Sequence, residues 1–231
     1  MTEHLAPMVG ILTRVPRVGR GKSRLAAAVG AETAAALSRA FLLDLVRELG
    51  HDDRWACALF VDPPEACDEV AALTGIADTR PQPSGSIGTR MAAAALSLAA
   101  GGTRAVVLVG SDAPHLEAGD VADLLATLWR QDIVFGPAED GGYYAVGLGP
   151  AVLDTRLEAL FGDEIPWSTN TVLRNSEQVA HGLGWSVARI RPLTDVDTVQ
   201  DLASLRRELA ARPEVADHTR DVLRVLEAQQ T

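Results

Sequence analysis

Residues 9–25 of the chain, VGILTRVPRVGRGKSRL, decide the fold. The run Val9–Leu12 is short and apolar, as in a buried strand, and Pro16 and Gly19 mark the turn that follows it. Beyond the turn, residues 25–50 carry an apolar stripe at helical spacing, which predicts a helix. The stripe consists of Leu37, Phe41, Leu45 and Leu49. A strand, a loop with glycines and a helix in this order are typical of an α/β domain.

The loop in this stretch is basic, although the chain as a whole is acidic. The 231 residues include 21 Lys and Arg and 31 Asp and Glu, which gives a formal net charge of −10 at pH 7. No acid occurs between His4 and Ala31, and Lys22 is the only lysine of the chain. The loop cations are Arg14, Arg17, Arg20, Lys22 and Arg24. The overall charge argues against nucleic acid or a membrane surface as partner, whereas the local cluster suits a small anion.

The loop matches neither of two common phosphate-binding motifs in full. Residues 21–23 read GKS, like the end of a P-loop, but Pro16 stands where the first glycine of that motif belongs. Gly19 and Gly21 are followed by Arg24 where a dinucleotide fingerprint has its third glycine. A solvated basic loop is the alternative, because charge runs usually are solvated. We favour an anion cradle made of backbone N–H groups, the helix N-terminus and the side-chain cations.

Apolar periodicity predicts alternating strands and helices along the rest of the chain. The predicted strands are 55–61, 105–109, 133–135, 143–148 and 186–190, and the predicted helices are 64–73, 87–100, 121–129, 170–183 and 199–211. Such alternation indicates a mostly parallel sheet with helices on both faces. We therefore expect one domain over residues 1–212, with residues 213–231 as its C-terminal helical tail. The tail can pack on the core or on a second copy in a homodimer.

Two further observations bear on location. No apolar run approaches the roughly 18 residues of a membrane span. The first eight residues, MTEHLAPM, lack the apolar core of a signal peptide. We therefore expect a cytoplasmic protein without a membrane partner.

Polar segments follow several predicted strands, at the edge where α/β sheets bind ligands. Asp112 comes just after the strand 105–109, and the next helix begins only near Glu117, so Asp112 is placed to hold a divalent cation rather than to cap a helix. His115 is expected to be a surface turn histidine. Residues 135–144 predict a β-hairpin whose turn gathers two acids and two tyrosines, which suit sugar hydroxyls.

The segment DVDT at 195–198 precedes the predicted helix 199–211. Asp197 or Thr198 can cap that helix, as residues of this kind often do. Alternatively, Asp197 supplies a second carboxylate to the ion on Asp112. The sequence leaves both interpretations open.

Six motifs, taken in order, resemble a bacterial family of GT-A-like transferases. They are RxPxxGxxKSRL (14–25), QPSGSIGTRM (82–91), GSDAP (110–114), GPAEDGGYY (136–144), IPWST (165–169) and DVDT (195–198). Members of that family carry names such as radical-SAM/selenodomain-associated or arsenosugar-type glycosyltransferase. More distantly, the chain is similar to 2-phospholactate guanylyltransferase and to molybdenum-cofactor and sugar nucleotidyltransferases. Arg14 stands where the family often has Lys, which keeps the charge, and Ala113 where it often has Cys.

The resemblance implies a single-domain, Rossmann-like nucleotide-diphospho-sugar transferase (GT-A) fold with a bound nucleotide and a Mg²⁺ or Mn²⁺ ion. The ion would be held by Asp112, with Asp197 as the second carboxylate. The nucleotide, an NTP or an NDP-sugar, would lie on the first loop and near the second motif. The residues expected there are Arg14, Gly19, Gly21, Lys22, Arg24, Gln82, Gly85, Gly88 and Arg90. The residues expected at the substrate are Glu139, Asp140, Gly141, Gly142, Tyr143, Trp167 and Ser168.

The dense basic loop favours nucleotidyl transfer, because an NTP carries more negative charge than an NDP-sugar. In that reaction Lys22 and Arg24 hold the β- and γ-phosphates, Asp112 acts with the metal, and a phosphorylated small molecule such as a sugar 1-phosphate attacks the α-phosphorus and releases pyrophosphate. One alternative is a glycosyltransferase that uses a nucleotide-sugar donor and a hydroxyl-bearing acceptor. The other is a protein that binds a nucleotide without turning it over.

Overall fold

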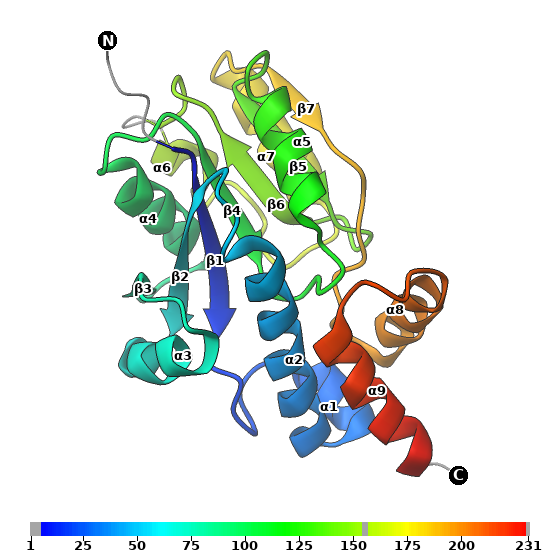
Figure 1. The fold of residues 1–231 in the computed structure, drawn as a ribbon. Helices are drawn as coiled ribbons and strands as arrows, with labels where there is room; N and C mark the ends of the chain where they lie inside the picture. Colours follow the sequence, from blue (N-terminus) through cyan, green and yellow to red (C-terminus); the bar gives the residue numbers. More distant parts are fainter. Residues whose placement is uncertain (1–5, 154–156, 230–231) are drawn as a thin grey trace.

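The strands form one sheet in the order β3-β2-β1-β4-β6-β5-β7 in a computed structural model, which describes residues 6–153 and 157–229 (Figure 1). The strands are β1 (Met8–Arg14), β2 (Ala56–Asp62), β3 (Thr79–Pro81), β4 (Val106–Gly110), β5 (Ile133–Pro137), β6 (Tyr143–Leu148) and β7 (Val187–Arg189). Neighbouring strands are parallel except at β4–β6 and β5–β6, so β6 alone runs the other way. This arrangement confirms the predicted mostly parallel sheet.

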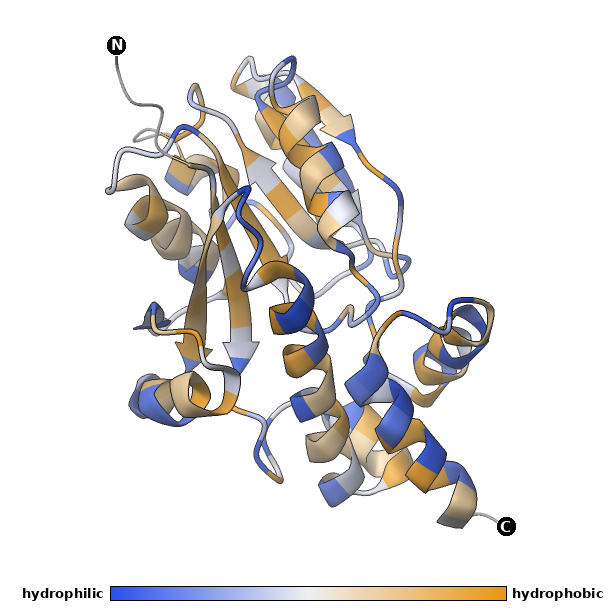
Figure 2. Cartoon of the chain, in the orientation of Figure 1, coloured by the Kyte–Doolittle hydropathy of each residue, from blue (hydrophilic) through white to orange (hydrophobic). Residues whose placement is uncertain are grey.

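Helices cover both faces of this sheet, as the buried strands require. They are α1 (Ser23–Val29), α2 (Ala31–Leu49), α3 (Cys67–Thr74), α4 (Ile87–Ala99), α5 (Ala118–Thr127), α6 (Leu157–Leu160), α7 (Val172–Gly182), α8 (Val199–Ala211) and α9 (Asp217–Gln229). One apolar cluster joins the sheet to α2, α3 and α5, and a second joins its other face to α4, α6 and α7. Figure 2 shows apolar colour along the strands and more polar colour on α8, α9 and the loop after β1. The predicted single-domain α/β fold is confirmed.

A third apolar cluster lies away from the sheet, among α1, α2, α8 and α9. It includes Leu25 of α1 and Phe41 of α2, both 0% exposed. The carboxylate of Asp44, on α2, accepts hydrogen bonds from the backbone N–H groups of His218 and Thr219 and from the Thr219 hydroxyl, and so holds the start of α9. The tail thus packs on its own chain, beside α2 (Figure 1). The homodimer stays a prediction. Residues 230–231 of the predicted tail lie outside the described residues, as do residues 1–5.

Three local features differ from the sequence prediction. The single helix expected over residues 25–50 is two helices, because Gly30, with φ 87°, separates α1 from α2. The strand β3 and the short helix α6 were not predicted. The helix α5 spans Ala118–Thr127 rather than 121–129. It begins beside Glu117, as expected for the helix after Asp112, because Glu117 and Asp120 form a capping box there.

None of the helices in the described part of the chain has both the length and the apolar character that crossing a bilayer requires. The sheet brings the carboxyl ends of β1, β2, β3 and β4 to one edge, because these four strands are parallel. The loops that leave this edge are the basic loop after β1, the segment after β3 and the Asp112 loop after β4.

Candidate active site

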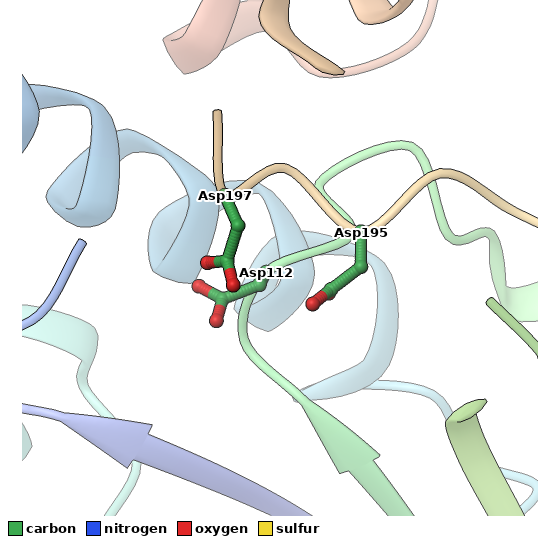
Figure 3. A group of neighbouring side chains, drawn as sticks. All are labelled: Asp112, Asp195 and Asp197. Carbon is green, nitrogen blue, oxygen red and sulfur yellow. The ribbon is translucent and has the colours of Figure 1, made fainter. Parts of the chain in front are cut away.

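Three aspartates from two distant segments meet at this edge of the sheet (Figure 3). Asp112 lies in the loop after β4, and Asp195 and Asp197 lie in the segment before α8. One carboxylate oxygen of each lies within 4.8 Å of the others. Val196, between the two aspartates, is 0% exposed and packs in the third cluster. Because side chains alternate along this segment, Asp195 and Asp197 both face away from that cluster.

Backbone contacts fix the position of the two segments. The N–H of Val196 donates a 2.9 Å hydrogen bond to the carbonyl oxygen of Asp112. Thr198 caps α8 in a capping box with Asp201, whose carboxylate also accepts from the backbone N–H of Asp197. The cap is therefore Thr198, which leaves the Asp197 carboxylate free to face Asp112.

Lys22 brings the ammonium group into this acidic cluster. Its Nζ lies 2.5 Å from Asp112 Oδ1 and 3.7 Å from Asp197 Oδ1, and it donates a 2.6 Å hydrogen bond to the carbonyl oxygen of Val196. Burial acts to lower the pKa of this ammonium, but Asp112, Asp197 and Asp195 together outweigh it and hold the pKa above its ordinary value. Lys22 is therefore charged at neutral pH.

Asp195 has a strongly raised pKa. Burial raises its pKa well above the ordinary value of 3.8, the neighbouring Asp112 carboxylate raises it further, and Lys22 opposes both. Carboxylates crowded in this way repel one another unless a cation lies among them. Three carboxylates also supply the hard oxygen ligands that Mg²⁺ and Mn²⁺ prefer. The donor set therefore fits a divalent cation.

A cleft of about 680 Å³ opens beside the aspartates. Its walls come from the end of β1, the basic loop, the start of α4, the Asp112 loop and the segment around Trp167. Five cations and three carboxylates line it, although the whole protein is acidic: Arg14, Arg20, Lys22, Arg24, Arg90, Asp112, Asp195 and Asp197. The basic loop and Arg90 of α4 thus concentrate positive charge at this one place.

The loop cations differ in their partners. The Arg24 guanidinium donates to Asp197 Oδ2 at 2.9 Å, while its side chain remains 71% exposed. Arg14 and Arg90 both reach Asp62 Oδ2, at 3.5 and 3.0 Å. Arg17 is turned away and pairs with Glu69. Arg20 lines the cleft and has no ion-pair partner among the described residues, so its charge is available to a ligand.

The structure brings many of the predicted site residues to the cleft. Those that line it are Arg14, Gly21, Lys22, Arg24, Gln82, Gly85, Arg90, Asp112, Trp167, Ser168 and Asp197. Gln82 is largely buried, and its amide donates to the carbonyl oxygens of Thr13 and Phe60, which ties the ends of β1 and β2 together. Its side chain therefore has a structural contact in addition to its place in the cleft.

The other predicted residues do not line this cleft. Gly19 lies in the exposed part of the basic loop. Gly88 lies inside α4, where an added Cβ would come within 2.6 Å of the Trp167 ring, so a glycine there lets the ring pack closely. Tyr143 packs on Phe135, with ring centroids 4.9 Å apart. The remaining four, Glu139, Asp140, Gly141 and Gly142, form the turn of the β5–β6 hairpin.

Two residues show where sequence reasoning fell short. Asp195 was not predicted as a ligand, although its place two residues before Asp197, across an apolar residue, indicates a shared face. His115 was predicted to lie at the surface, and this was wrong: it is 1% exposed, with Nε2 3.2 Å from Glu208 Oε2 on α8. Its partner Glu208 is distant in sequence, so no local pattern indicates the contact.

Comparison with solved structures agrees with the fold. A protein from Desulfovibrio desulfuricans G20, provisionally named a nucleotide-diphospho-sugar transferase, is 28% identical with a TM-score of 0.85 over 96% of this chain and 95% of that one. A cytidylyltransferase from Leptospira borgpetersenii serovar Hardjo-bovis shares the fold at 11% identity and a TM-score of 0.57, covering 98% of this chain and 96% of that one. The 4-diphosphocytidyl-2C-methyl-D-erythritol synthase from Anaerococcus prevotii DSM 20548 also shares the fold, at 10% identity and a TM-score of 0.59. That match covers 89% of this chain and 96% of that one.

These neighbours confirm the expected GT-A-like, nucleotide-diphospho-sugar transferase fold. No curated protein matches the sequence. Residues 45–169, more than half of the chain, match the family described as "Uncharacterized protein conserved in bacteria (DUF2064)". The protein therefore belongs to the DUF2064 family.

Proposed function

We propose that this protein is a metal-dependent nucleotidyltransferase that joins an NTP to a phosphorylated small molecule, such as a sugar 1-phosphate, and releases pyrophosphate. One observation carries the proposal: the cleft sets five cations beside three clustered aspartates in a protein of net charge −10. A triphosphate needs more positive charge than a nucleotide diphosphate-sugar does. The solved structures of similar fold include cytidylyltransferases, which supports the same class of reaction.

The cations would bind the triphosphate and orient it. Arg20, in the exposed part of the loop, and Arg24, at the start of α1, would reach the β- and γ-phosphates. Lys22 and Arg24 both contact Asp197, so these cations adjoin the aspartates. Their fixed charges would stabilise the pyrophosphate as negative charge develops on it. In the reaction an oxygen of the acceptor phosphate forms a bond to the α-phosphorus. The bond from the α-phosphorus to the oxygen that bridges it to the β-phosphorus breaks, and pyrophosphate leaves with that oxygen. No general base is needed, because a phosphate monoester is already ionised.

Asp112, Asp195 and Asp197 would hold a Mg²⁺ or Mn²⁺ ion, which when bound neutralises charge on the phosphate oxygens. Gln82, Gly85 and Arg90 form the wall near β3, where they would contact the base or the acceptor. Trp167 and Ser168 line the cleft from a further segment of the chain and would contact a cyclic acceptor. Roles for Gly19, Gly88 and the hairpin turn stay predictions.

A glycosyltransferase is the second candidate. Asp195 and Asp197 form a D-x-D pair in the metal cluster, an arrangement that can hold the diphosphate of a nucleotide-sugar through an ion. The Desulfovibrio relative is provisionally named for that class of substrate. The two reactions differ in their substrates and products, so two parallel incubations separate them.

The purified protein should be incubated with Mg²⁺, each of the four NTPs and a panel of sugar 1-phosphates, and assayed for pyrophosphate. Pyrophosphate formation that requires both substrates supports the proposal, and the Asp112→Asn variant should abolish it. Asp53→Asn, which removes an exposed acid after α2, is the matched control and should be fully active. If no pyrophosphate forms there, while a parallel incubation with NDP-sugars in place of the NTPs consumes the NDP-sugar, the glycosyltransferase is established. Tight nucleotide binding with no product would indicate a binding protein.

A further inference from the structure

Lys22 places its ammonium group among the carboxylates that we propose for the metal. The Nζ atom contacts Asp112 Oδ1, the Asp197 carboxylate and the carbonyl oxygen of Val196. The side chain is 5% exposed, unlike that of Arg24, which also pairs with Asp197 but projects into solvent. The ammonium therefore lies among the oxygen atoms where a bound metal ion would lie.

The backbone of the basic loop holds Lys22 in this position. Lys22 has φ 44° and ψ 42°, a left-handed conformation that residues other than glycine rarely adopt, and Gly21 before it has φ 70°. The helix α1 begins at the next residue, and its Leu25 is fully buried in the third cluster. The Phe41 ring lies 5.1 Å from Nζ and adds a cation–π contact. The surrounding packing thus keeps an unfavourable backbone conformation that aims Lys22 at the aspartates.

The ammonium and a divalent cation compete for the same oxygens. Both need Asp112 and Asp197, and two cations a few ångströms apart repel strongly where little water separates them. Lys22 also lines the cleft, and its flexible four-carbon stem allows the ammonium to turn from the aspartates toward the cleft. In the cleft, phosphate oxygens would accept the hydrogen bonds that the carboxylates had accepted.

We infer that Lys22 is the resident cation of the aspartate cluster in the metal-free protein, and that it leaves the cluster when a divalent cation enters. The inference rests on the proposed function only in the assumption that such an ion binds there. It predicts that the ion binds weakly by itself and more tightly with a nucleotide, because the phosphates give the displaced ammonium a new partner.

Calorimetric titration with Mn²⁺ alone tests the competition. Lys22→Gln removes the competing charge, so this variant should bind Mn²⁺ about tenfold more tightly than the wild type, or better still. Arg17→Gln is the matched control: it removes a positive charge from the same loop, but Arg17 pairs with Glu69 and does not line the cleft. Its affinity for Mn²⁺ should match that of the wild type. Equal or weaker binding by Lys22→Gln would overturn the inference, as would no binding by either protein.

A second measurement uses the wild type alone, in case Lys22→Gln does not fold. Because Lys22 is the only lysine, mass spectrometry after reductive methylation reports on this one side chain. The rate of its methylation should rise several-fold at saturating Mg²⁺, while the α-amino group of the same chain serves as the internal reference. An unchanged rate would overturn the inference. Neither measurement needs a nucleotide, so both can succeed even if the protein releases no pyrophosphate.

Discussion

The N–H of Val196 donates a 2.9 Å hydrogen bond to the carbonyl oxygen of Asp112. This bond joins the loop after β4 to the segment before α8 through the backbone alone. The register of Asp112 with Asp195 and Asp197 therefore does not depend on any one carboxylate. Single substitutions of these aspartates consequently test their chemistry rather than the architecture of the site.

Asp112→Asn, Asp195→Asn and Asp197→Asn should each weaken Mn²⁺ binding by about tenfold or more, because an amide replaces a charged ligand. Binding can be followed by the loss of the free Mn²⁺ signal in electron paramagnetic resonance. Asp53→Asn should bind like the wild type. A variant of the cluster with wild-type affinity would exclude that residue as a ligand.

Arg20→Gln should weaken nucleotide binding by about 10- to 100-fold, since a hydrogen bond to a charged group contributes roughly 1.5–3 kcal/mol and 1.4 kcal/mol is about tenfold. Arg20 lines the cleft without an ion-pair partner among the described residues, whereas Arg17, three residues earlier in the same loop, pairs with Glu69. Arg17→Gln should therefore leave the affinity unchanged. Fluorescence titration with each NTP measures the difference, and equal losses in both variants would mean that only the general charge of the loop matters.

Gly88→Ala should destabilise the protein by about 1–3 kcal/mol, because overpacking forces neighbours to move. The added Cβ would come within 2.1 Å of the Phe161 carbonyl oxygen and 2.6 Å of the Trp167 ring. Gly119→Ala, in α5, meets nothing within 4 Å and should be neutral or slightly stabilising. Urea unfolding gives the free energies. Equal stability of the two variants would show that α4 and the Trp167 segment separate at no cost.

The pH dependence of stability should change when His115 is replaced. Burial, then the charges of Arg191 and Arg212, lower the pKa of His115 from 6.5 to about 4, against the opposing effect of Asp120, and Glu208 faces its Nε2. Since the unfolded chain takes up this proton near pH 6.5 and the folded chain only near pH 4, acidification through that window favours unfolding. The free energy of unfolding falls by up to roughly 3 kcal/mol through this effect, at about 1.4 kcal/mol per pKa unit.

In His115→Gln this contribution is absent, so its free energy of unfolding should fall less than that of the wild type between pH 7 and pH 4. Urea unfolding of both proteins at several pH values between 7 and 4 measures this difference in the free energy of unfolding. Parallel pH profiles for the two proteins would mean that His115 has the same pKa in the folded and unfolded chains.

Most of the sheet was predictable because each strand is a local apolar run. The antiparallel strand β6 follows from the hairpin predicted over residues 135–144, whose turn the structure confirms. The strand β3 was not predictable in this way. Its sequence, Thr-Arg-Pro, has no strand pattern, and it forms only by pairing with Leu59–Val61 of β2. The break at Gly30 was overlooked because the apolar stripe that predicted the helix, from Leu37 to Leu49, lies entirely after it.

The site was predictable where a motif carried it and not where tertiary contacts did. Asp112 and Asp197 came from their motifs, and the structure places them together with Asp195. Lys22 was predicted to face phosphates, and nothing local to it shows that its ammonium reaches carboxylates from two distant segments. His115 was misplaced for the same reason, because the groups that it meets in its buried position, such as Glu208 of α8, are far along the chain.

The third apolar cluster has a consequence for residues far from the cleft. Leu25, just after the basic loop, and Val196, between two of the aspartates, both rest on it, and so does α9. The C-terminal helix thus packs against the elements that hold both the basic loop and the Asp195–Asp197 segment. Substitutions on the face of α9 that packs on α2 should weaken ligand binding before they unfold the sheet. Natural variants of this chain should therefore tolerate change more readily on the exposed face of α9 than on the face that meets α2.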